Sequence, residues 1–428
     1  MKNIIDELSW RGLIQNSVPG VEKQLKKTTT IYIGFDPTSD SLHIGSLLPI
    51  IILIHFQKMG HKSLILIGGA TGFIGDPSGK YDQRIFLKKK TLQENIESIK
   101  KQLSKLLDSY SKKIEFINNF DWIKNISFLE FIRNIGKHFT INYMISKDSV
   151  KKRIQDNKKY KGISFMEFTY TLIQGYDFFY LNKKKNCLLQ VGGSDQWGNI
   201  TTGIELIKKK TGKKAYGITF PLVTRTDGLK FGKSKKEGNI WLDDNRTSPY
   251  KFYQFWINIS DIEIENFIKK YTFFSKKKIE KLILKHRKNP EKRLLQKKLA
   301  SEITKWVHGK KSYEKVVKIS HILFGKKYTN NLFSSLDEDI LNSLYDNIPH
   351  MHLPDKDFRK GIFLLDLLKK SNLFKSKSEA NRALNLNSIY INKKIIKKNI
   401  LLKKENVIKK KYILLQFGKK MFFIIKIE

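Results

Sequence analysis

The sequence predicts an α/β protein in which a domain built round a parallel sheet comes first, a helical domain second and a small α+β domain last. Thr30–Phe35 and Lys62–Ile67 are short apolar runs with β-branched residues, and the mostly apolar stretch His43–Met59 between them has the length of a helix. A strand, a helix and a strand in this order are typical of a βαβ unit, whose two strands are parallel. We therefore expect residues 1–228 to form a Rossmann-like nucleotide-binding domain.

Other segments extend this first domain. Residues 1–27 have the pattern of an amphipathic helix followed by a loop. Leu188–Val191 is a further short apolar run that ends in two glycines, and residues 198–209 follow it with a helical pattern. The apolar run and the helical pattern after it predict another strand of the same sheet and a helix that follows it.

Three more segments follow. Residues 229–324 begin with a lysine-rich loop and become helical from Ser248, with little β signal. Residues 325–355 contain Asn, Ser, Asp and two prolines with weak periodicity, which predicts a linker. Residues 356–428 regain periodicity, helices first and short strands afterwards, which predicts a small α+β domain.

The chain is strongly basic, with 82 Lys and Arg against 40 Asp and Glu and a formal net charge of +42. Such a charge attracts polyanions, so nucleic acid is the leading partner and an anionic membrane surface the second. Mutational bias toward A and T would also enrich Lys, Asn and Ile throughout, and the charge would then mainly confer solubility. Residues 356–428 hold 20 Lys and Arg against 5 Asp and Glu, and this concentration favours nucleic-acid binding there.

The sequence also indicates a compartment. No run of about 18 apolar residues occurs, and charged residues stand at the start, where a signal peptide needs apolar ones. Cys187 is the single cysteine, so no intramolecular disulfide can form. We expect no membrane span and a cytoplasmic location.

The first motif with chemical meaning is Gly34–Thr38 followed by His43–Ser46, which reads as a strand end, a turn and a helix start. Backbone N–H groups at a helix start favour an anion. Gly45 lets a nucleotide approach closely, and Thr38 and His43 can donate hydrogen bonds to phosphate oxygens. A histidine at such a place is more often structural when it stands alone.

The second motif is Lys230-Phe-Gly-Lys233-Ser. Two lysines around a glycine form a cationic loop that can stabilise the charge on a leaving pyrophosphate. In a chain with this many lysines, a solvated loop is the default interpretation of the motif alone.

Together the two motifs resemble the paired signatures of class I aminoacyl-tRNA synthetases. The other stretches are similar to those of bacterial-type tyrosyl-tRNA synthetases, namely Gly68–Gly79, Tyr170 with Gln174–Asp177, Gln190–Asn199 and Thr247–Trp256. The resemblance covers nearly the whole chain. It implies that L-tyrosine is activated by ATP with Mg²⁺ and then joined to tRNA(Tyr), with no zinc and no prosthetic group.

The resemblance also implies roles for single residues. Tyr32 and Asp177 would meet the phenolic hydroxyl of the substrate, while Asp76, Tyr170 and Gln174 would hold its ammonium group. Gly193, Asp195 and Gln196 would contact the adenylate, and Thr38 and His43 the γ-phosphate. The loops over the pyrophosphate would carry Lys80, Arg84, Lys230 and Lys233. The remaining residues expected to bind ATP are Gly34, Asp36 and Gly45.

The last segment resembles a small RNA-binding domain found in a ribosomal protein and in some pseudouridine synthases, through Ser376–Leu384 and Ile389–Lys394. Arg382, Lys393 and Lys394 are its expected RNA-binding residues, and a merely solvated basic face is the alternative. The family further implies help from residues 248–324 in binding the anticodon arm. It also implies a homodimer, with Phe165 and residues 125–165 as the expected interface.

Two other functions stay open. A tryptophan-specific relative would share the fold and both signatures, although Tyr32 and Asp177 favour tyrosine. A non-catalytic RNA-binding paralogue would not need His43, Lys233 and Asp177, all of which are present.

Overall fold

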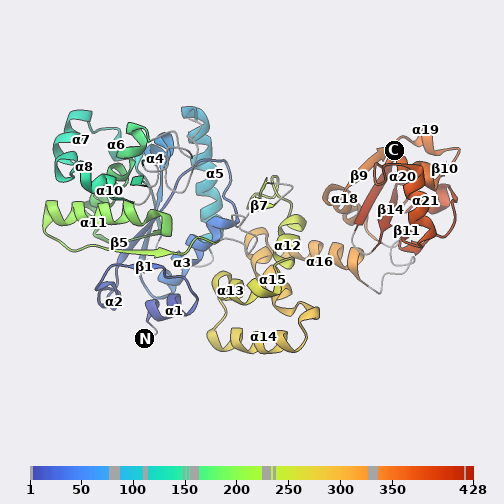
Figure 1. The fold of residues 1–428 in the computed structure, drawn as a ribbon, viewed down its shortest axis with the longest axis horizontal. Coiled ribbons are helices and arrows are strands. Elements are labelled where there is room, and N and C mark those ends of the chain that lie inside the picture. The colour runs from blue at the N-terminus through green and yellow to red at the C-terminus, as the bar shows by residue number, and fades with distance from the viewer. Residues whose placement is uncertain are drawn as a thin grey trace. The chain divides into compact units, whose positions relative to one another are not determined.

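The computed structural model describes residues 3–76, 87–108, 114–147, 150–151, 154, 163–223, 233–234, 238–325, 336–418 and 421–428 (Figure 1). The chain divides into two compact units. Unit 1 consists of Met1–Thr247 and Trp256–Ile303, and unit 2 of Ser248–Phe255 and Thr304–Glu428.

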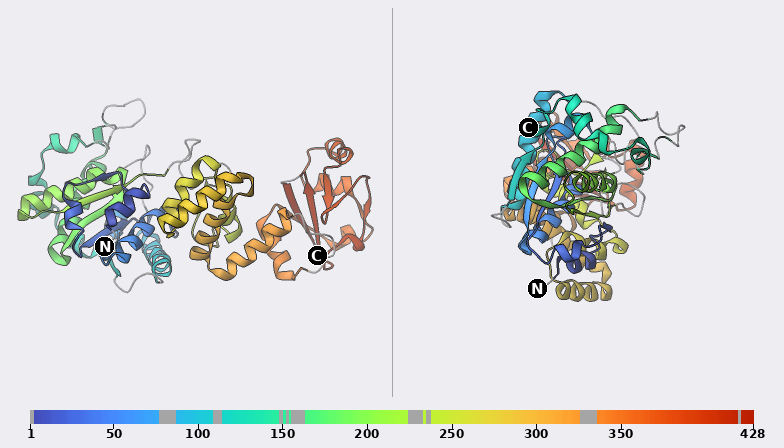
Figure 2. Two further views of the ribbon diagram at one scale, coloured as in Figure 1. Left: turned by 90° about the horizontal axis from the view of Figure 1, so that it is seen from below. Right: turned by 90° about the vertical axis from the view of Figure 1, so that its left-hand side faces the viewer.

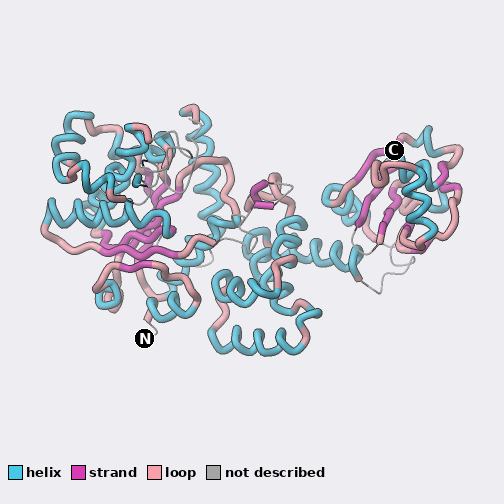
Figure 3. The backbone as a smooth tube through the Cα atoms, in the orientation of Figure 1, coloured by secondary structure: helices cyan, strands magenta, loops and turns pink. Residues whose placement is uncertain are grey.

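Unit 1 contains a six-stranded sheet with the strand order β1-β6-β5-β2-β3-β4 (Figure 3). All neighbouring strands are parallel except β1 and β6, which are antiparallel. This confirms the predicted α/β class with a parallel sheet. The strands are β1 (Asn16–Ser17), β2 (Thr30–Phe35), β3 (Lys62–Ile67), β4 (Ile114–Asn118), β5 (Cys187–Gly193) and β6 (Tyr216–Phe220).

Helices cover this sheet and extend unit 1. They are α1 (Ile4–Trp10), α2 (Val21–Gln24), α3 (Leu47–Lys58), α4 (Gly69–Ile74), α5 (Lys89–Leu107), α6 (Phe120–Ile123), α7 (Phe128–Asn134), α8 (Ile141–Ile145), α10 (Phe165–Lys185), α11 (Trp197–Thr211), α13 (Asp261–Tyr271) and α14 (Lys276–Lys288). Helix α3 is buried along most of its length, because it packs against β3, α1, α5 and α13. Burial on every side explains why its sequence is apolar all round rather than amphipathic.

The strand order creates a crevice at one edge of the sheet. From β2 the chain continues outward to β3 and β4, whereas β5 and β6 lie on the other side of β2. Open α/β sheets bind ligands at such a switch point, beyond the carboxyl ends of the strands. The residues after Phe35 and around Gly193 are therefore expected to line a binding site.

Unit 2 contains a five-stranded sheet with the order β12-β11-β14-β15-β9 (Figure 2). Its elements are α16 (Lys310–Phe324), α18 (Glu338–Asn347), β9 (His350–Leu353), α19 (Asp355–Phe358), β10 (Ile362–Phe363), α20 (Leu364–Lys370), α21 (Lys377–Asn385), β11 (Ile389–Ile391), β12 (Lys394–Ile395), β13 (Leu401–Leu402), β14 (Tyr412–Phe417) and β15 (Met421–Ile427). Apolar side chains of α20, α21, β14 and β15 form one core, as expected for a small α+β domain.

The start of this domain differs from the expected linker at 325–355. The described part of that segment forms helix α18 and strand β9, and β9 pairs in parallel with β15. Leu353 is fully buried opposite Ile427. The four residues of β9 contain no β-branched side chain and are too short a run to indicate a strand. The strand is evident only from its pairing with β15, far away in the sequence. The other expected domain boundaries stay predictions.

Helices α12 (Pro249–Ile257) and α15 (Leu294–His308) follow the predicted helical pattern of residues 248–324. In the part of the chain that the structure describes, no helix is both long and apolar enough to cross a membrane.

Candidate functional site

A cavity of about 740 Å³ lies at the switch point of the unit 1 sheet. Its walls come from the ends of β2 and β5, the turn before α3, and the segment after β8 (Gly238–Asn239). The structure brings most of the sequence-predicted site residues together here: Tyr32, Gly34, Asp36, Thr38, His43, Gly45, Asp76, Gln174, Asp177, Gly193, Asp195 and Gln196. Tyr170 adjoins them, since its hydroxyl donates to Asp36 Oδ2 at 3.1 Å.

One end of the cavity presents a buried carboxylate and a buried phenol. Asp177 accepts hydrogen bonds from Trp122 Nε1 at 2.8 Å and from Asn119 Nδ2 at 2.9 Å. Burial raises the pKa of Asp177 to about 7, although these two hydrogen bonds act in the opposite direction. The hydroxyl of Tyr32 is buried without a hydrogen-bond partner among the described residues. Burial of an unsatisfied hydroxyl is unfavourable, so Tyr32 and Asp177 are suited to a ligand that carries its own hydroxyl.

A network of side-chain amides forms the next wall. Gln196 donates to Asp76 Oδ2 at 2.7 Å and accepts from Gln174 at 3.1 Å. Asn199 donates to both glutamines, at 2.9 Å to Gln174 and 3.1 Å to Gln196. These bonds fix the amide orientations, and together with the Asp76 carboxylate they form a polar wall suited to an ammonium group.

Asp36 places a second carboxylate at the end of β2. Its Oδ1 accepts a hydrogen bond from Thr71 at 2.8 Å, and its Oδ2 accepts the one from Tyr170. A side chain at Gly68 would put its Cβ 2.1 Å from Asp36 Oδ1, so only glycine allows this close approach.

His43 stands at the start of the short helix Ile44–Ser46, which leads into α3. Its Nδ1 accepts a hydrogen bond from the backbone N–H of Gly45 at 3.0 Å. In a neutral ring whose Nδ1 accepts, the proton sits on Nε2. His43 therefore offers an Nε2–H donor in the same cavity that Thr38 lines.

The segment that follows the lysine motif is bonded to the His43 turn. Ile44 N donates to Ile240 O at 3.0 Å, and Leu242 N donates to Leu42 O at 2.8 Å. Upstream, strand β8 pairs with β7 (Lys233–Ser234), so the backbone of Lys233 lies opposite Asn239, which lines the cavity. Lys80, Arg84, Lys230 and the side chain of Lys233 lie outside the described residues.

Sequence reasoning missed several residues of this site. Asn119 and Trp122 orient Asp177 but belong to a stretch without a recognisable motif, 58 and 55 residues before it. Gln190 lines the cavity, and its Oε1 is buried with no partner among the described residues. Trp241 also lines the cavity. Of these residues, only Gln190 could have been found from the sequence, because it begins the Gln190–Asn199 stretch that resembles the family.

The three residues expected to bind RNA differ in their surroundings. Arg382 on α21 and Lys394 on β12 are exposed. Lys393 is half-buried: its ammonium donates to Leu323 O and to Gln416 Oε1, and burial lowers its pKa to about 8. Lys393 thus fastens the end of α16 to the C-terminal sheet, a packing role that the sequence did not indicate.

Within the described ranges, no group of three or more His, Cys, Asp or Glu side chains could hold a metal ion.

Two family models match the chain. Residues 23–325 match the model of "tRNA synthetases class I (W and Y)", and residues 339–425 match the "Tyrosine--tRNA ligase SYY-like C-terminal domain". The second match begins at residue 339, inside the expected linker at 325–355. This agrees with strand β9, which belongs to the C-terminal sheet.

Curated relatives are similar over their full length. The tyrosine–tRNA ligase of Flavobacterium johnsoniae is 50% identical over 434 residues, covering 100% of both chains. That of Bacteroides fragilis is 47% identical over 429 residues, covering 99% of both.

Solved structures agree. A C-terminally truncated mitochondrial tyrosyl-tRNA synthetase of Aspergillus nidulans has a TM-score of 0.68 and 32% identity, over 76% of this chain and 95% of that one. A tryptophanyl-tRNA synthetase of Encephalitozoon cuniculi, at 16% identity and a TM-score of 0.52 over 73% of this chain and 87% of that one, shares the fold.

Proposed function

The chain belongs to the tyrosine–tRNA ligases among the class I tRNA synthetases, and we propose that the unit 1 cavity is where it activates L-tyrosine with ATP. The tyrosine carboxylate attacks the α-phosphate of ATP, and pyrophosphate leaves as tyrosyl-adenylate forms. The 3′-terminal hydroxyl of tRNA(Tyr) then takes the tyrosyl group and AMP is released. ATP enters with Mg²⁺ as part of the substrate.

The buried hydroxyl of Tyr32 and the buried carboxylate of Asp177 in one cavity are the observation that supports tyrosine best. In this proposal, the phenol of the substrate donates to the Asp177 carboxylate and accepts from the Tyr32 hydroxyl. Both groups are buried, and an amino acid without the hydroxyl would leave the Tyr32 hydroxyl unpaired and add nothing to the two hydrogen bonds that Asp177 already accepts. Tyrosyl-tRNA synthetase is the known example of this kind of discrimination, because it rejects phenylalanine by about 10⁵-fold.

The other walls suit the rest of the reacting molecules. Asp76, Gln174 and Tyr170 would hold the ammonium group, and Gly193, Asp195 and Gln196 the adenylate. No side chain acts as a covalent nucleophile in this scheme. Thr38 and the Nε2–H of His43 would instead donate to phosphate oxygens as charge develops, so that the site lowers the barrier by positioning and by electrostatic stabilisation.

Amino-acid-dependent exchange of pyrophosphate into ATP tests this function. Exchange with tyrosine, but not with tryptophan or phenylalanine, is the expected result. Exchange with tryptophan would make the chain a tryptophan-specific enzyme. No exchange together with retained tRNA binding would make it a non-catalytic RNA-binding protein.

We further propose that the chain forms a symmetric homodimer through the face around α7, α8 and the start of α10. An apolar groove of about 550 Å³ lies there, lined by residues of the expected interface segment and by the following turns of α10. Phe128, Ile141 and Phe165 are 63%, 64% and 68% exposed along it. A large contiguous apolar patch on a single chain indicates an interface. A partner chain that covers this groove would also contact α10, the helix that carries Gln174 and Asp177.

Sedimentation of the purified chain tests the dimer. Phe165→Asp would place a charge in the interface and shift the mass to that of one chain. The control is Ile262→Asp, because Ile262 is 83% exposed on α13 outside this groove. A monomeric unsubstituted chain, or a Phe165→Asp variant that stays dimeric, would contradict the interface.

We also propose a cytoplasmic location, where tRNA and ATP are available.

A further inference from the structure

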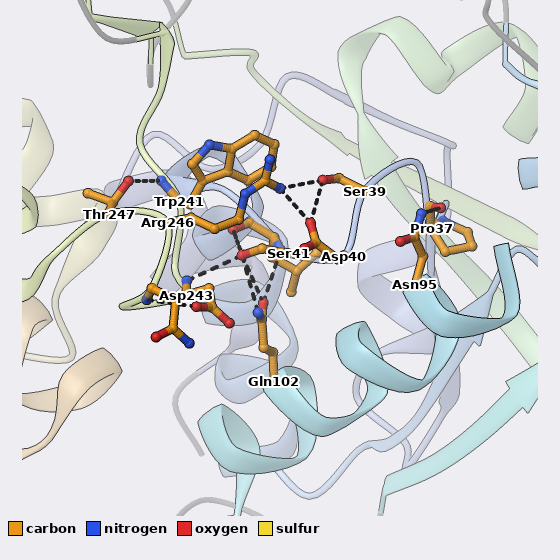
Figure 4. Close-up of polar contacts among 12 residues, drawn as sticks. Pro37, Ser39, Asp40, Ser41, Asn95, Gln102, Trp241, Asp243, Arg246 and Thr247 are labelled. Atoms are coloured by element: carbon orange, nitrogen blue, oxygen red, sulfur yellow. Dashed lines mark hydrogen bonds and ion pairs between the residues drawn. The ribbon is translucent and has the colours of Figure 1, made fainter. Parts of the chain in front are cut away.

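Arg246 joins two segments that flank the unit 1 cavity, as Figure 4 shows. Its Nη1 donates to Asp40 Oδ1 at 2.5 Å and to Ser39 Oγ at 2.6 Å. Ser39 in turn donates to the same Asp40 oxygen at 3.0 Å. Ser39 lines the cavity and precedes His43 by four residues, so this cluster lies on the turn that presents the histidine.

The same guanidinium stacks on an aromatic ring of the cavity wall. The Arg246 Cζ lies 3.8 Å from the centroid of the Trp241 ring, a close cation–π geometry. The centroid of the His43 ring lies 6.4 Å from that of Trp241 in an edge-on arrangement. Trp241 thus contacts both Arg246 and the ring of His43.

Backbone and side-chain bonds on the inner side fix the same two segments. Asp243 N donates to Ser41 Oγ at 3.2 Å, and Gln102 of α5 accepts from Leu42 N at 2.9 Å (Figure 4). Trp241 N donates to Thr247 Oγ1 at 3.0 Å, which closes the turn that carries Arg246. Each of these bonds fixes a backbone N–H of one segment on a side-chain oxygen, whereas the Arg246 contacts join side chains of the two segments.

We propose that Arg246 is a positioning residue for the activation reaction. By bonding to Ser39 and Asp40 while stacking on Trp241, it holds the His43 turn against the segment that follows the Lys230–Ser234 motif. The turn that presents His43 is then kept in place beside Trp241 in the cavity wall. This inference rests on the proposed activation of tyrosine in that cavity.

The exposure of Arg246 and Asp40 indicates whether their substitution should affect stability or rate. The side chains of Arg246 and Asp40 are 36% and 59% exposed, so their ion pair is screened by solvent and adds little to folding stability. A small displacement of reacting groups has a much larger effect on rate, up to roughly 100-fold for about 1 Å. A positioning role therefore lowers the turnover number for adenylate formation while stability hardly changes.

Tyrosine-dependent pyrophosphate exchange by the full chain tests the proposal. Arg246→Ala is expected to lower the kcat of exchange about tenfold while KM for tyrosine stays within about twofold, because the groups around Asp177 are untouched. Arg246→Lys should restore part of the rate, since it keeps the charge but lacks the planar group that stacks on Trp241. Arg287→Ala is the matched control, because Arg287 makes an exposed bidentate pair with Glu265 away from the cavity, at 2.7 Å for both bonds.

A second variant guards against misfolding and tests the mechanism. Asp40→Asn should lower kcat in the same direction, and the double variant Asp40→Asn/Arg246→Ala should be no slower than Arg246→Ala, because both changes break one interaction. Unchanged exchange in Arg246→Ala, multiplied losses in the double variant, or an equal loss in Arg287→Ala would overturn the positioning role. Absence of exchange in the unsubstituted chain would instead overturn the proposed function, and this inference with it.

Discussion

Trp122 donates its indole N–H to Asp177 at 2.8 Å, across 55 residues of sequence, and Asn119 donates to the other carboxylate oxygen at 2.9 Å. Both neighbours are donors, so the group between them must accept on each oxygen. The carboxylate is thereby fixed in orientation, and its remaining lone pairs are available to the cavity. In the proposed function, Trp122 and Asn119, neither of which lines the cavity, thus orient the acceptor for the substrate hydroxyl.

Replacement of Asp177 should weaken tyrosine binding strongly. Asp177→Ala leaves the phenolic O–H of the substrate without its acceptor in a buried place, and also the donors of Trp122 and Asn119. An unsatisfied buried group costs about 1–3 kcal/mol, so we expect Kd for tyrosine to rise roughly 5- to 150-fold. Titration calorimetry measures this directly. Asp121→Ala, which removes an exposed acid of the same helix as Trp122, should bind tyrosine normally. Near-normal binding by Asp177→Ala would remove Asp177 from the site.

Gly45→Ala should impair adenylate formation without loss of tyrosine binding. A Cβ at this position would lie 2.7 Å from Cε1 and 2.9 Å from Nδ1 of His43, so the ring must move away from its bond to Gly45 N. We expect kcat of pyrophosphate exchange to fall roughly tenfold or more. In the control Gly198→Ala, the new Cβ meets only a lysine side chain at 3.6 Å. An unaffected Gly45→Ala enzyme would mean that the position of His43 does not matter.

Acid should destabilise unit 1 through His55. Burial, with Arg11 and Lys58 nearby, lowers the pKa of His55 from 6.5 to about 3. Between these values the unfolded chain binds a proton that the folded chain excludes, so stability present above pH 6.5 is lost as the pH falls. At pH 5 the unsubstituted chain should have lost about 2 kcal/mol relative to its value near pH 7.

Urea unfolding of the unsubstituted chain and of His55→Leu, at pH 7 and at pH 5, measures this difference. The leucine variant lacks the titrating ring and should lose about 2 kcal/mol less over the same interval. Equal losses in both proteins would show that His55 binds a proton as readily in the folded chain as in the unfolded one.

Arg382 tests the RNA-binding role of the C-terminal domain. If its exposed guanidinium contacts a tRNA phosphate, Arg382→Ala should weaken tRNA binding and reduce the salt dependence of log K by about one charge. Arg359→Ala removes an exposed arginine of the same domain that is already paired with Asp355 at 2.8 Å, and it should leave the slope unchanged. Binding measured from low to high salt separates the two. An unaltered slope in Arg382→Ala would favour a merely solvated basic face.

Local patterns predicted the elements whose partners lie close in sequence. The ranges Thr30–Phe35 and Lys62–Ile67 match β2 and β3, because a buried parallel strand is a short apolar run that needs no distant information. Strand β9 was missed because its burial depends on β15, some 70 residues later, and four residues carry no reliable period.

The site divides in the same way. Tyr32, Asp177 and Gln174 were identified through a family resemblance, and the structure places them in one cavity. Asn119 and Trp122 were missed because an asparagine and a tryptophan in an ordinary stretch become functional only through the carboxylate they orient. Lys393 stays a predicted RNA-binding residue, but its place in a basic run did not indicate that its ammonium donates to Leu323 O and Gln416 Oε1.

The parallel pairing of β9 with β15 has a consequence for biosynthesis. The strand that leads into the C-terminal domain lies beside the strand made last among the five, so the ribosome must deliver β15 before the sheet can be completed. Until then β9 has no strand to pair with, and Leu353 lacks its neighbour Ile427. Premature stop codons shortly before β15 should therefore leave a sheet with an open edge, prone to aggregation and proteolysis, beside an already folded unit 1.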